Sequence, residues 1–143
     1  MNNTPINELK LKLPSLSVNE GACRAIVAAF CAQLDPNIEE LADIKCAVSE
    51  AVTNCIVHAY GGRGGTIYIT VGLYEGRAIR IEVRDRGCGI ANVKEAMQPL
   101  FTTDHTGERS GMGFSVMESF MTRLRVHSTL SRGTRVTMWK QLA

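Results

Sequence analysis

Glu50 and Asn54 stand four residues apart within residues 44–60, IKCAVSEAVTNCIVHAY. On a helix this spacing places a carboxylate and a carboxamide on one ridge, one turn apart, so both can converge on a single ligand. An Asn supplies a neutral oxygen for a metal-bound phosphate, and a Glu can act as a base towards a hydroxyl or water. His58 continues the same edge. A solvated helix edge with no chemical role is the alternative for an isolated pair.

Asp85 follows an alternating segment and precedes Gly87 and Gly89. An aspartate at a strand end can accept a hydrogen bond from an exocyclic amine, and the glycines allow a flat ring or a phosphate chain to approach the backbone. Asp and Gly are also common turn residues. The pattern therefore fits either a ligand site or a plain turn.

Gly111 and Gly113 precede an apolar stripe of helical period. A glycine pair at a helix start can be a tight loop, or it can present free N–H groups to phosphates. The string GMGFSV lacks the third glycine of a dinucleotide fingerprint, and GxxxxGK[ST] does not occur. Neither a Rossmann site nor a P-loop is therefore expected.

The elements that must hold these residues follow from hydrophobic periodicity. We expect helices at 18–32, with Ser15 or Ser17 as N-cap, and at 38–60, and a short helix near 93–97. Alternation predicts strands at 9–13, 67–73, 79–83, 124–128 and 134–140. A polar loop covers 99–110 before the helix that opens at Gly111. This order predicts an α/β two-layer sandwich, a mostly antiparallel mixed sheet with helices on one face.

The amino-acid composition limits the classes of function that the chain can have. The 143 residues are 45% hydrophobic and 21% charged with a net charge of +2, so we expect one globular domain, 1–143. No Lys/Arg cluster interleaved with aromatics argues for nucleic acid, and no apolar run reaches the roughly 18 residues of a membrane span. With no signal-peptide layout, a cytoplasmic protein is expected. The five cysteines form no C-x-x-C pair, and we expect them to be reduced and mostly structural.

The order of these motifs resembles a known site. Glu-x-x-x-Asn on a helix, Asp-x-Gly-x-Gly after a strand, a polar loop and Gly-x-Gly at a helix start are similar to the nucleotide site of the GHKL ATPase/kinase superfamily, which includes gyrase, histidine kinases and MutL. The strings SEAVTNCIVHAY, QPLFTTDHTGERSGMGFSVMESFM and GTRVTMWK look like the small serine kinases that act as anti-sigma factors, the anti-sigma F factors of endospore-forming bacteria in particular. General-stress anti-sigma kinases are the nearest alternative.

This resemblance implies a Bergerat ATP-binding fold and an ATP-dependent protein serine kinase. By it, Glu50 is the catalytic base, and Asn54 coordinates a Mg²⁺ ion that bridges the phosphates of ATP. Asp85 reads the adenine amino group, with Thr134 assisting through water. Arg109 meets the terminal phosphate from a lid over ATP or ADP. The implied nucleotide-binding set further contains Gly87, Gly89, Thr103, Ser110, Gly111, Met112 and Gly113.

The resemblance also implies partners. A homodimer holds sigma factor F inactive when ATP is bound and phosphorylates a serine of an anti-anti-sigma factor. Arg24 matches a family position used for both partners, although an ordinary solvated Arg is the alternative. A catalytically inactive nucleotide-gated binding module is a rival, which Glu50 disfavours. The detached ATP domain of a histidine kinase is a second rival, disfavoured because no helical hairpin with a phosphoacceptor His is found.

Overall fold

The computed structural model describes residues 4–98 and 113–143, and these form a sheet covered on one side by helices. The strands run β1, β2, β3, β5, β4 across the sheet, and every neighbouring pair is antiparallel. Their bounds are β1 (Asn7–Pro14), β2 (Thr66–Tyr74), β3 (Ala78–Arg84), β4 (Arg123–Thr129) and β5 (Gly133–Gln141). The expected two-layer arrangement is confirmed, with antiparallel pairing throughout these strands in place of a mixed sheet.

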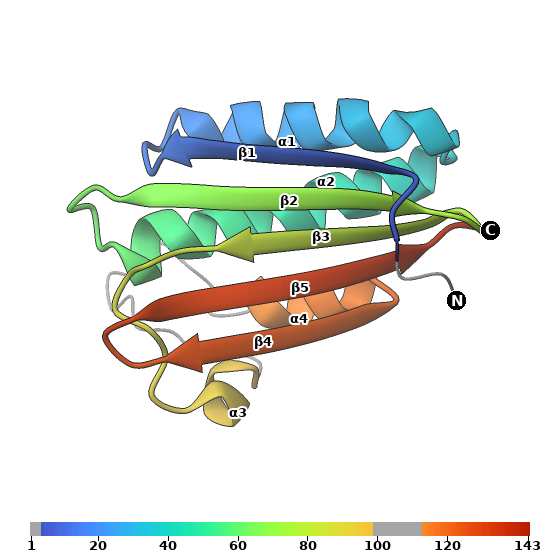
Figure 1. The fold of residues 1–143 in the computed structure, drawn as a ribbon. Helices are drawn as coiled ribbons and strands as arrows, with labels where there is room; N and C mark the ends of the chain where they lie inside the picture. The colour runs from blue at the N-terminus through green and yellow to red at the C-terminus, as the bar shows by residue number, and fades with distance from the viewer. Residues whose placement is uncertain (1–3, 99–112) are drawn as a thin grey trace.

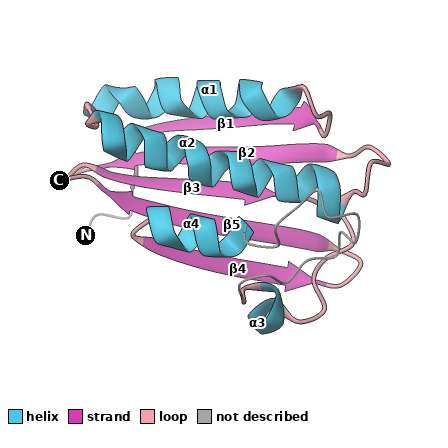
Figure 2. Ribbon diagram, turned by 180° about the vertical axis from the view of Figure 1, so that it is seen from behind, coloured by secondary structure: helices cyan, strands magenta, loops and turns pink. Residues whose placement is uncertain are grey.

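Three helices lie together on one face of the sheet. Figure 2 shows α1 (Asn19–Cys31), α2 (Ile38–Thr53) and α4 (Gly113–Phe120) there, and α3 (Val93–Ala96) lies at the edge next to β4. A 3₁₀ turn, η1 (Ala32–Leu34), follows α1. Figure 1 looks onto the opposite face of the sheet, which none of the described helices covers.

The core lies between the helices and the sheet because each strand of the central hairpin alternates. Ile67, Ile69, Val71 and Leu73 of β2, and Ile79, Ile81 and Val83 of β3, are at most 1% exposed. A two-residue period places all of them on the helical side. From α2, Ile44, Val48 and Val52 pack against them at 0% exposure. The expected strand and helix positions are thus confirmed, with ends shifted by one or a few residues.

The start of α1 differs from expectation. Its N-cap is Val18, with no side-chain cap hydrogen bond, so neither Ser15 nor Ser17 caps the helix through its hydroxyl. Ser15 Oγ is buried and finds no partner among the described residues. The chain instead turns through backbone bonds, and Asn19 Nδ2 donates to Pro14 O at 2.9 Å. By contrast, α2 begins with a capping box between Asn37 and Glu40, at 2.7 and 2.9 Å.

The second helix does not run unchanged to residue 60. It is α-helical to Thr53 and then widens into a π-helical turn, η2 (Asn54–Ala59), in which Tyr60 N donates to Cys55 O at 3.1 Å. Single π-turns within α-helices are often found at functional sites. Here the widened turn begins at Asn54, one of the two residues singled out by spacing.

Candidate functional site

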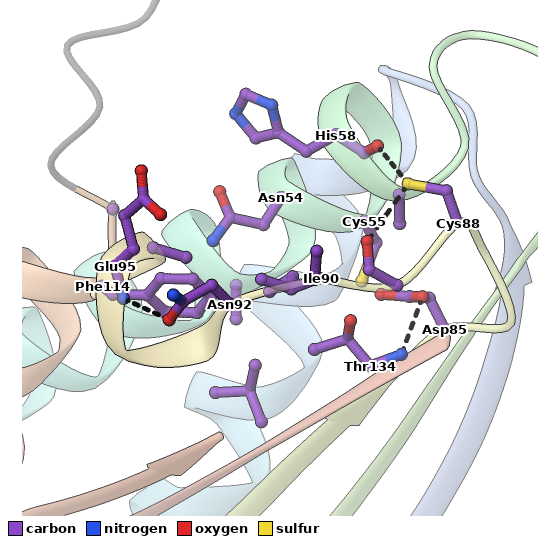
Figure 3. A pocket seen from close by; sticks show the side chains of 17 residues that line it. Asn54, Cys55, His58, Asp85, Cys88, Ile90, Asn92, Glu95, Phe114 and Thr134 are labelled. Atoms are coloured by element: carbon purple, nitrogen blue, oxygen red, sulfur yellow. Dashed lines mark hydrogen bonds between the residues drawn. The ribbon is translucent and has the colours of Figure 1, made fainter. Parts of the chain in front are cut away.

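A cavity of about 270 Å³ opens between η2, the segment after β3, α3 and the start of α4. Its lining includes Asn54, Asp85, Gly89, Gly113 and Thr134, five of the residues expected at a site. Figure 3 shows Asp85 and Thr134 at one end beside Cys55, and Asn92, Glu95 and Phe114 at the other. Residues far apart in sequence therefore line one space, mostly with apolar atoms, as small-molecule sites usually are.

Asp85 is a buried carboxyl at one end of the cavity. It is 6% exposed, and its Oδ1 accepts hydrogen bonds from Gly87 N at 3.0 Å and Thr134 N at 3.1 Å. Burial raises the pKa of Asp85, and the hydrogen bonds partly offset that rise. A fixed acceptor of this kind suits an amine donor on a planar ligand.

Ser128, which the sequence interpretation missed, supports this end of the cavity. Its Oγ accepts from Ile90 N at 2.7 Å, lies 2.8 Å from Thr134 Oγ1 and lies 3.1 Å from Gly133 O. One hydroxyl therefore ties β4, β5 and the segment after β3 together. Its position at the end of an alternating strand looked like ordinary β-structure, so nothing local distinguished it.

Gly87 and Gly89 are required by contacts within the chain. A Cβ on Gly87 would lie 2.3 Å from Ala59 O, and a Cβ on Gly89 would lie 2.3 Å from Thr129 O. Gly89 also has a φ of +75°, which a side chain disfavours. Gly89 lines the cavity, whereas Gly87 packs against the end of η2. Both glycines are therefore needed for contacts within the chain, and the approach of a ligand to their backbone stays a prediction.

Glu50 and Asn54 meet at the first residue of α4. A Cβ on Gly113 would lie 3.2 Å from Asn54 Oδ1 and 3.3 Å from Glu50 Oε2. Both side chains are partly buried. The start of a helix presents N–H groups and a partial positive charge, which favours an anion such as phosphate beside this pair. The tertiary structure thus joins two motifs that lie about sixty residues apart.

Two cysteines border the same space. Cys55 is 3% exposed, and burial followed by the nearby Asp85 carboxylate raises the pKa of its thiol. Cys88 is exposed and its Sγ donates to His58 O at 3.4 Å. All five cysteines lie within the described residues and are free, as expected from their spacing. His58 itself lines the cavity from η2.

Comparison with known proteins decides the family. A model of the histidine kinase-like ATPase domain matches residues 13–140. An anti-sigma F factor of Caldanaerobacter subterraneus is 56% identical over 95% of this chain and 94% of its own length. One from Anoxybacillus flavithermus is 50% identical over 95% and 93%. The chain belongs to the anti-sigma F factor family.

The fold agrees with this assignment. The crystal structure of the RsbU and RsbW domains of Rv1364c from Mycobacterium tuberculosis superposes with a TM-score of 0.68, at 21% identity, over 96% of this chain and 33% of that one. The fold of this family member is that of a histidine kinase-like ATPase, and such folds bind nucleotides. Within residues 4–98 and 113–143, no helix is long and apolar enough to cross a membrane.

Several expected nucleotide contacts lie outside the described residues. These are Thr103, Arg109, Ser110, Gly111 and Met112, together with the expected lid of residues 99–110. Of the glycine motif at the helix start, Gly113 is described and begins α4.

Arg24 lies on the exposed side of α1, away from the cavity lining. Its Nη1 is 3.4 Å from Glu20 Oε1, one helical turn earlier. Ser49, the neighbour of Glu50 on α2, donates to the same Glu20 oxygen. The side chain expected to contact partners is therefore connected through Glu20 to the helix that carries Glu50 and leads into Asn54.

Proposed function

We propose that this protein is a single-domain, ATP-dependent anti-sigma factor and protein serine kinase. In this proposal ATP with Mg²⁺ fills the cavity, the ATP-bound protein inhibits sigma factor F, and a serine of an anti-anti-sigma factor accepts the γ-phosphoryl group. The proposal treats residues 1–143 as one cytoplasmic unit that acts as a homodimer, without direct contact to nucleic acid or to a membrane.

One observation carries the catalytic part. Glu50 and Asn54 converge at Gly113, next to a cavity that Asp85 and Thr134 line at its other end. A nucleotide with its base at Asp85 would extend its phosphates towards α4, where Asn54 could supply a metal ligand. Mg²⁺ commonly combines one or two protein oxygens with substrate phosphates and water, and an amide oxygen on a partly buried ridge fits that preference. Glu50 would then face the acceptor hydroxyl as base.

The partner assignment is supported by the relatives named anti-sigma F factors, which match almost the whole chain at about half identity. This similarity favours sigma factor F over the general-stress alternative. Arg24, exposed on α1, is proposed as a contact for sigma factor and anti-anti-sigma factor. An exposed Arg supported by one carboxylate can anchor an interface.

Homodimer formation is supported by apolar residues that the core does not use. Ile6, Leu16, Val18 and Ile26 are 57%, 54%, 79% and 42% exposed, and all belong to α1 or to the segments beside β1 and α1. Exposed apolar surface of this kind favours an interface, and two-fold dimers are the commonest oligomers. Sedimentation of a monomer at micromolar concentration with ATP present would contradict this part.

The decisive experiment incubates the protein with labelled ATP, Mg²⁺ and a purified anti-anti-sigma factor, and then maps the label by mass spectrometry. We expect one labelled serine and none in a reaction without Mg²⁺. Sigma factor capture is measured in parallel with ATP and with ADP. ATP-dependent capture without any labelled serine would indicate a nucleotide-gated binding module that has no kinase activity.

A further inference from the structure

A row of basic side chains crosses the uncovered face of the sheet. In the strand register Lys12 of β1 lies beside Tyr68 of β2, and Tyr68 beside Arg84 of β3. Arg84 lies beside Arg135 of β5, which lies beside His127 of β4. We call these five residues, four basic side chains and Tyr68, the basic row. It spans about 19 Å, since adjacent strands lie about 4.8 Å apart, and it contains no carboxylate. Figure 1 looks onto this face.

This arrangement is electrostatically unfavourable by itself. Arg84 and Arg135 are direct cross-strand partners, and like charges in that position destabilise a sheet. Both guanidinium groups are permanently charged. Glu82 is a neighbouring carboxylate on this face, at 3.7 Å from Arg135 Nε, but Glu82 also pairs with Arg80 at 3.6 Å. The Glu82 carboxylate is therefore shared between Arg80 and Arg135, and the basic row keeps an excess of positive charge.

The surface is hollowed where these charges are densest. A cavity of about 400 Å³ is lined by Arg84, Arg86, His127, Arg132 and Arg135. Two of these side chains are held in place, because Arg84 and Arg86 lie over the Tyr68 ring at 4.8 and 5.0 Å from its centroid. Such cation–π contacts reduce the entropy lost when a ligand binds. We call this cavity the basic hollow.

The basic hollow is distinct from the nucleotide cavity, although the two share a wall. Along β3 and β5, Arg84 and Arg135 point to the uncovered face, whereas Val83 and Val136 are buried on the helical side. Asp85 and Thr134 border both cavities, and the Asp85 Oδ1 atom accepts a hydrogen bond from Thr134 N at 3.1 Å. This one carboxylate borders the hollow together with four arginines, so the lining keeps an excess of positive charge.

We propose that the basic hollow binds a small compound that carries two or more linked phosphate groups. Guanidinium groups pair with phosphate through two parallel hydrogen bonds, and four of them border this hollow. The volume is in the range of small-ligand sites. A compact ligand is favoured over an extended polymer because the charge is concentrated at β3, β5 and β4, while β1 and β2 add only Lys12 to the row.

Calorimetric titration with inorganic tripolyphosphate tests this site, in Mg²⁺-free buffer at fixed salt. The test variant is Arg132→Gln/Arg135→Gln, and the matched control is Arg123→Gln/Arg125→Gln, which removes the same charge from the opposite end of the β4–β5 hairpin. We expect the test variant to bind at least about tenfold more weakly than wild type, and the control to stay within about threefold. Circular dichroism confirms that each variant is folded.

Three results would overturn the proposal. The first is a failure of specific binding: wild type does not bind millimolar tripolyphosphate, or its binding is weakened equally in both double variants. Equal weakening would indicate general attraction to a basic protein. The second is binding that Asn54→Ala abolishes and the test variant does not, which would place the anion in the nucleotide cavity. The third is binding of a ten-residue oligothymidylate, weakened by the test variant, without binding of tripolyphosphate. That result would assign the face to single-stranded nucleic acid. None of these results depends on kinase activity.

Discussion

Gly113 and Asn54 lie so close that a single methyl group on Gly113 would sit 3.2 Å from the Asn54 amide oxygen. The first residue of α4 is therefore small where the two polar side chains of α2 and η2 need room. Gly113→Ala should leave the fold intact, because the neighbours are side-chain ends and Ala favours helix. It should displace Asn54 and Glu50 and weaken Mg²⁺-dependent nucleotide binding by about 1–2 kcal/mol.

This prediction is measured as the ratio of ATP affinities with and without Mg²⁺, alongside the melting temperature. Ser115→Ala, two residues later and outside the cavity lining, is the control for general disturbance of the helix start. Unchanged metal dependence in the Gly113→Ala variant would show that the contact between α4 and Asn54 has no role in binding.

Substitutions of Glu50 and Asn54 should impair different properties, phosphoryl transfer in one case and metal-dependent ATP binding in the other. Glu50→Gln keeps the volume of the side chain but removes its basicity, so phosphoryl transfer should fall by about 10²–10⁴-fold while ATP binding and sigma factor capture persist. Asn54→Ala should lose metal-dependent ATP affinity first and transfer as a consequence. Single-turnover transfer and calorimetry separate the two effects. Transfer at the wild-type rate by the Glu50→Gln variant would make Glu50 a structural residue.

Asp85→Asn should weaken adenine nucleotides by about 1–3 kcal/mol, because the buried acceptor for an amine is lost. The same substitution should leave the folded protein as stable as the wild type at pH 7, or more stable. Since burial raises the pKa of Asp85, the folded state binds this proton more readily than the unfolded state. The charged carboxylate therefore costs stability above its raised pKa, and that cost disappears as the pH falls below the ordinary pKa of aspartate.

The variant should thus melt at the same or a higher temperature than wild type at pH 7, and the difference should shrink on acidification. Nucleotide affinity of the wild type should decrease as the pH is lowered over the same range, because the acceptor becomes protonated. Calorimetry and thermal melts between pH 4 and 8 check both trends. Equal affinity for ATP and GTP in the wild type would count against Asp85 as the reader of adenine.

Lys140 links three elements behind the site. Its Nζ donates to Asp43 Oδ2 of α2 at 3.0 Å and to Phe120 O, the end of α4, at 2.6 Å, and both charged side chains are mostly buried. A cation at a helix C-terminus is favourable, and a carboxylate left without its partner is costly. Lys140→Met should destabilise the protein by about 2 kcal/mol.

A double-mutant cycle with Asp43→Asn tests this coupling. If the two residues act as a pair, the double variant should be less destabilised than the sum of the single variants. Strict additivity in urea denaturation would show that Lys140 acts through Phe120 alone.

Arg24→Glu should abolish capture of sigma factor F and leave ATP affinity unchanged, since Arg24 lies outside the cavity. Arg63, exposed in the loop before β2, offers a matched charge reversal as control. Pull-down with ATP and calorimetry with ATP alone separate the two properties. Normal capture by the Arg24→Glu variant would remove Arg24 from the proposed interface.

The strands, the helices and the order of the motifs typical of a nucleotide site were predictable from the sequence. Ile67 to Leu73 alternate and are buried as expected, and Glu50 and Asn54 lie one turn apart, because side-chain periodicity depends on local backbone geometry. The cap of α1 and the widening at Asn54 were not predictable, since both depend on how the helix ends meet the rest of the fold.

Only the tertiary structure decided which distant residues became neighbours. No stretch of the sequence contains a basic cluster interleaved with aromatics, yet strand pairing places Arg84, Arg135 and His127 side by side next to Tyr68. Ser128 became a support of the cavity, and Gly87 a contact of Ala59, in the same way. Strand order and register are chosen by burial of the whole core, so contacts between strands far apart in sequence cannot be derived from any one segment.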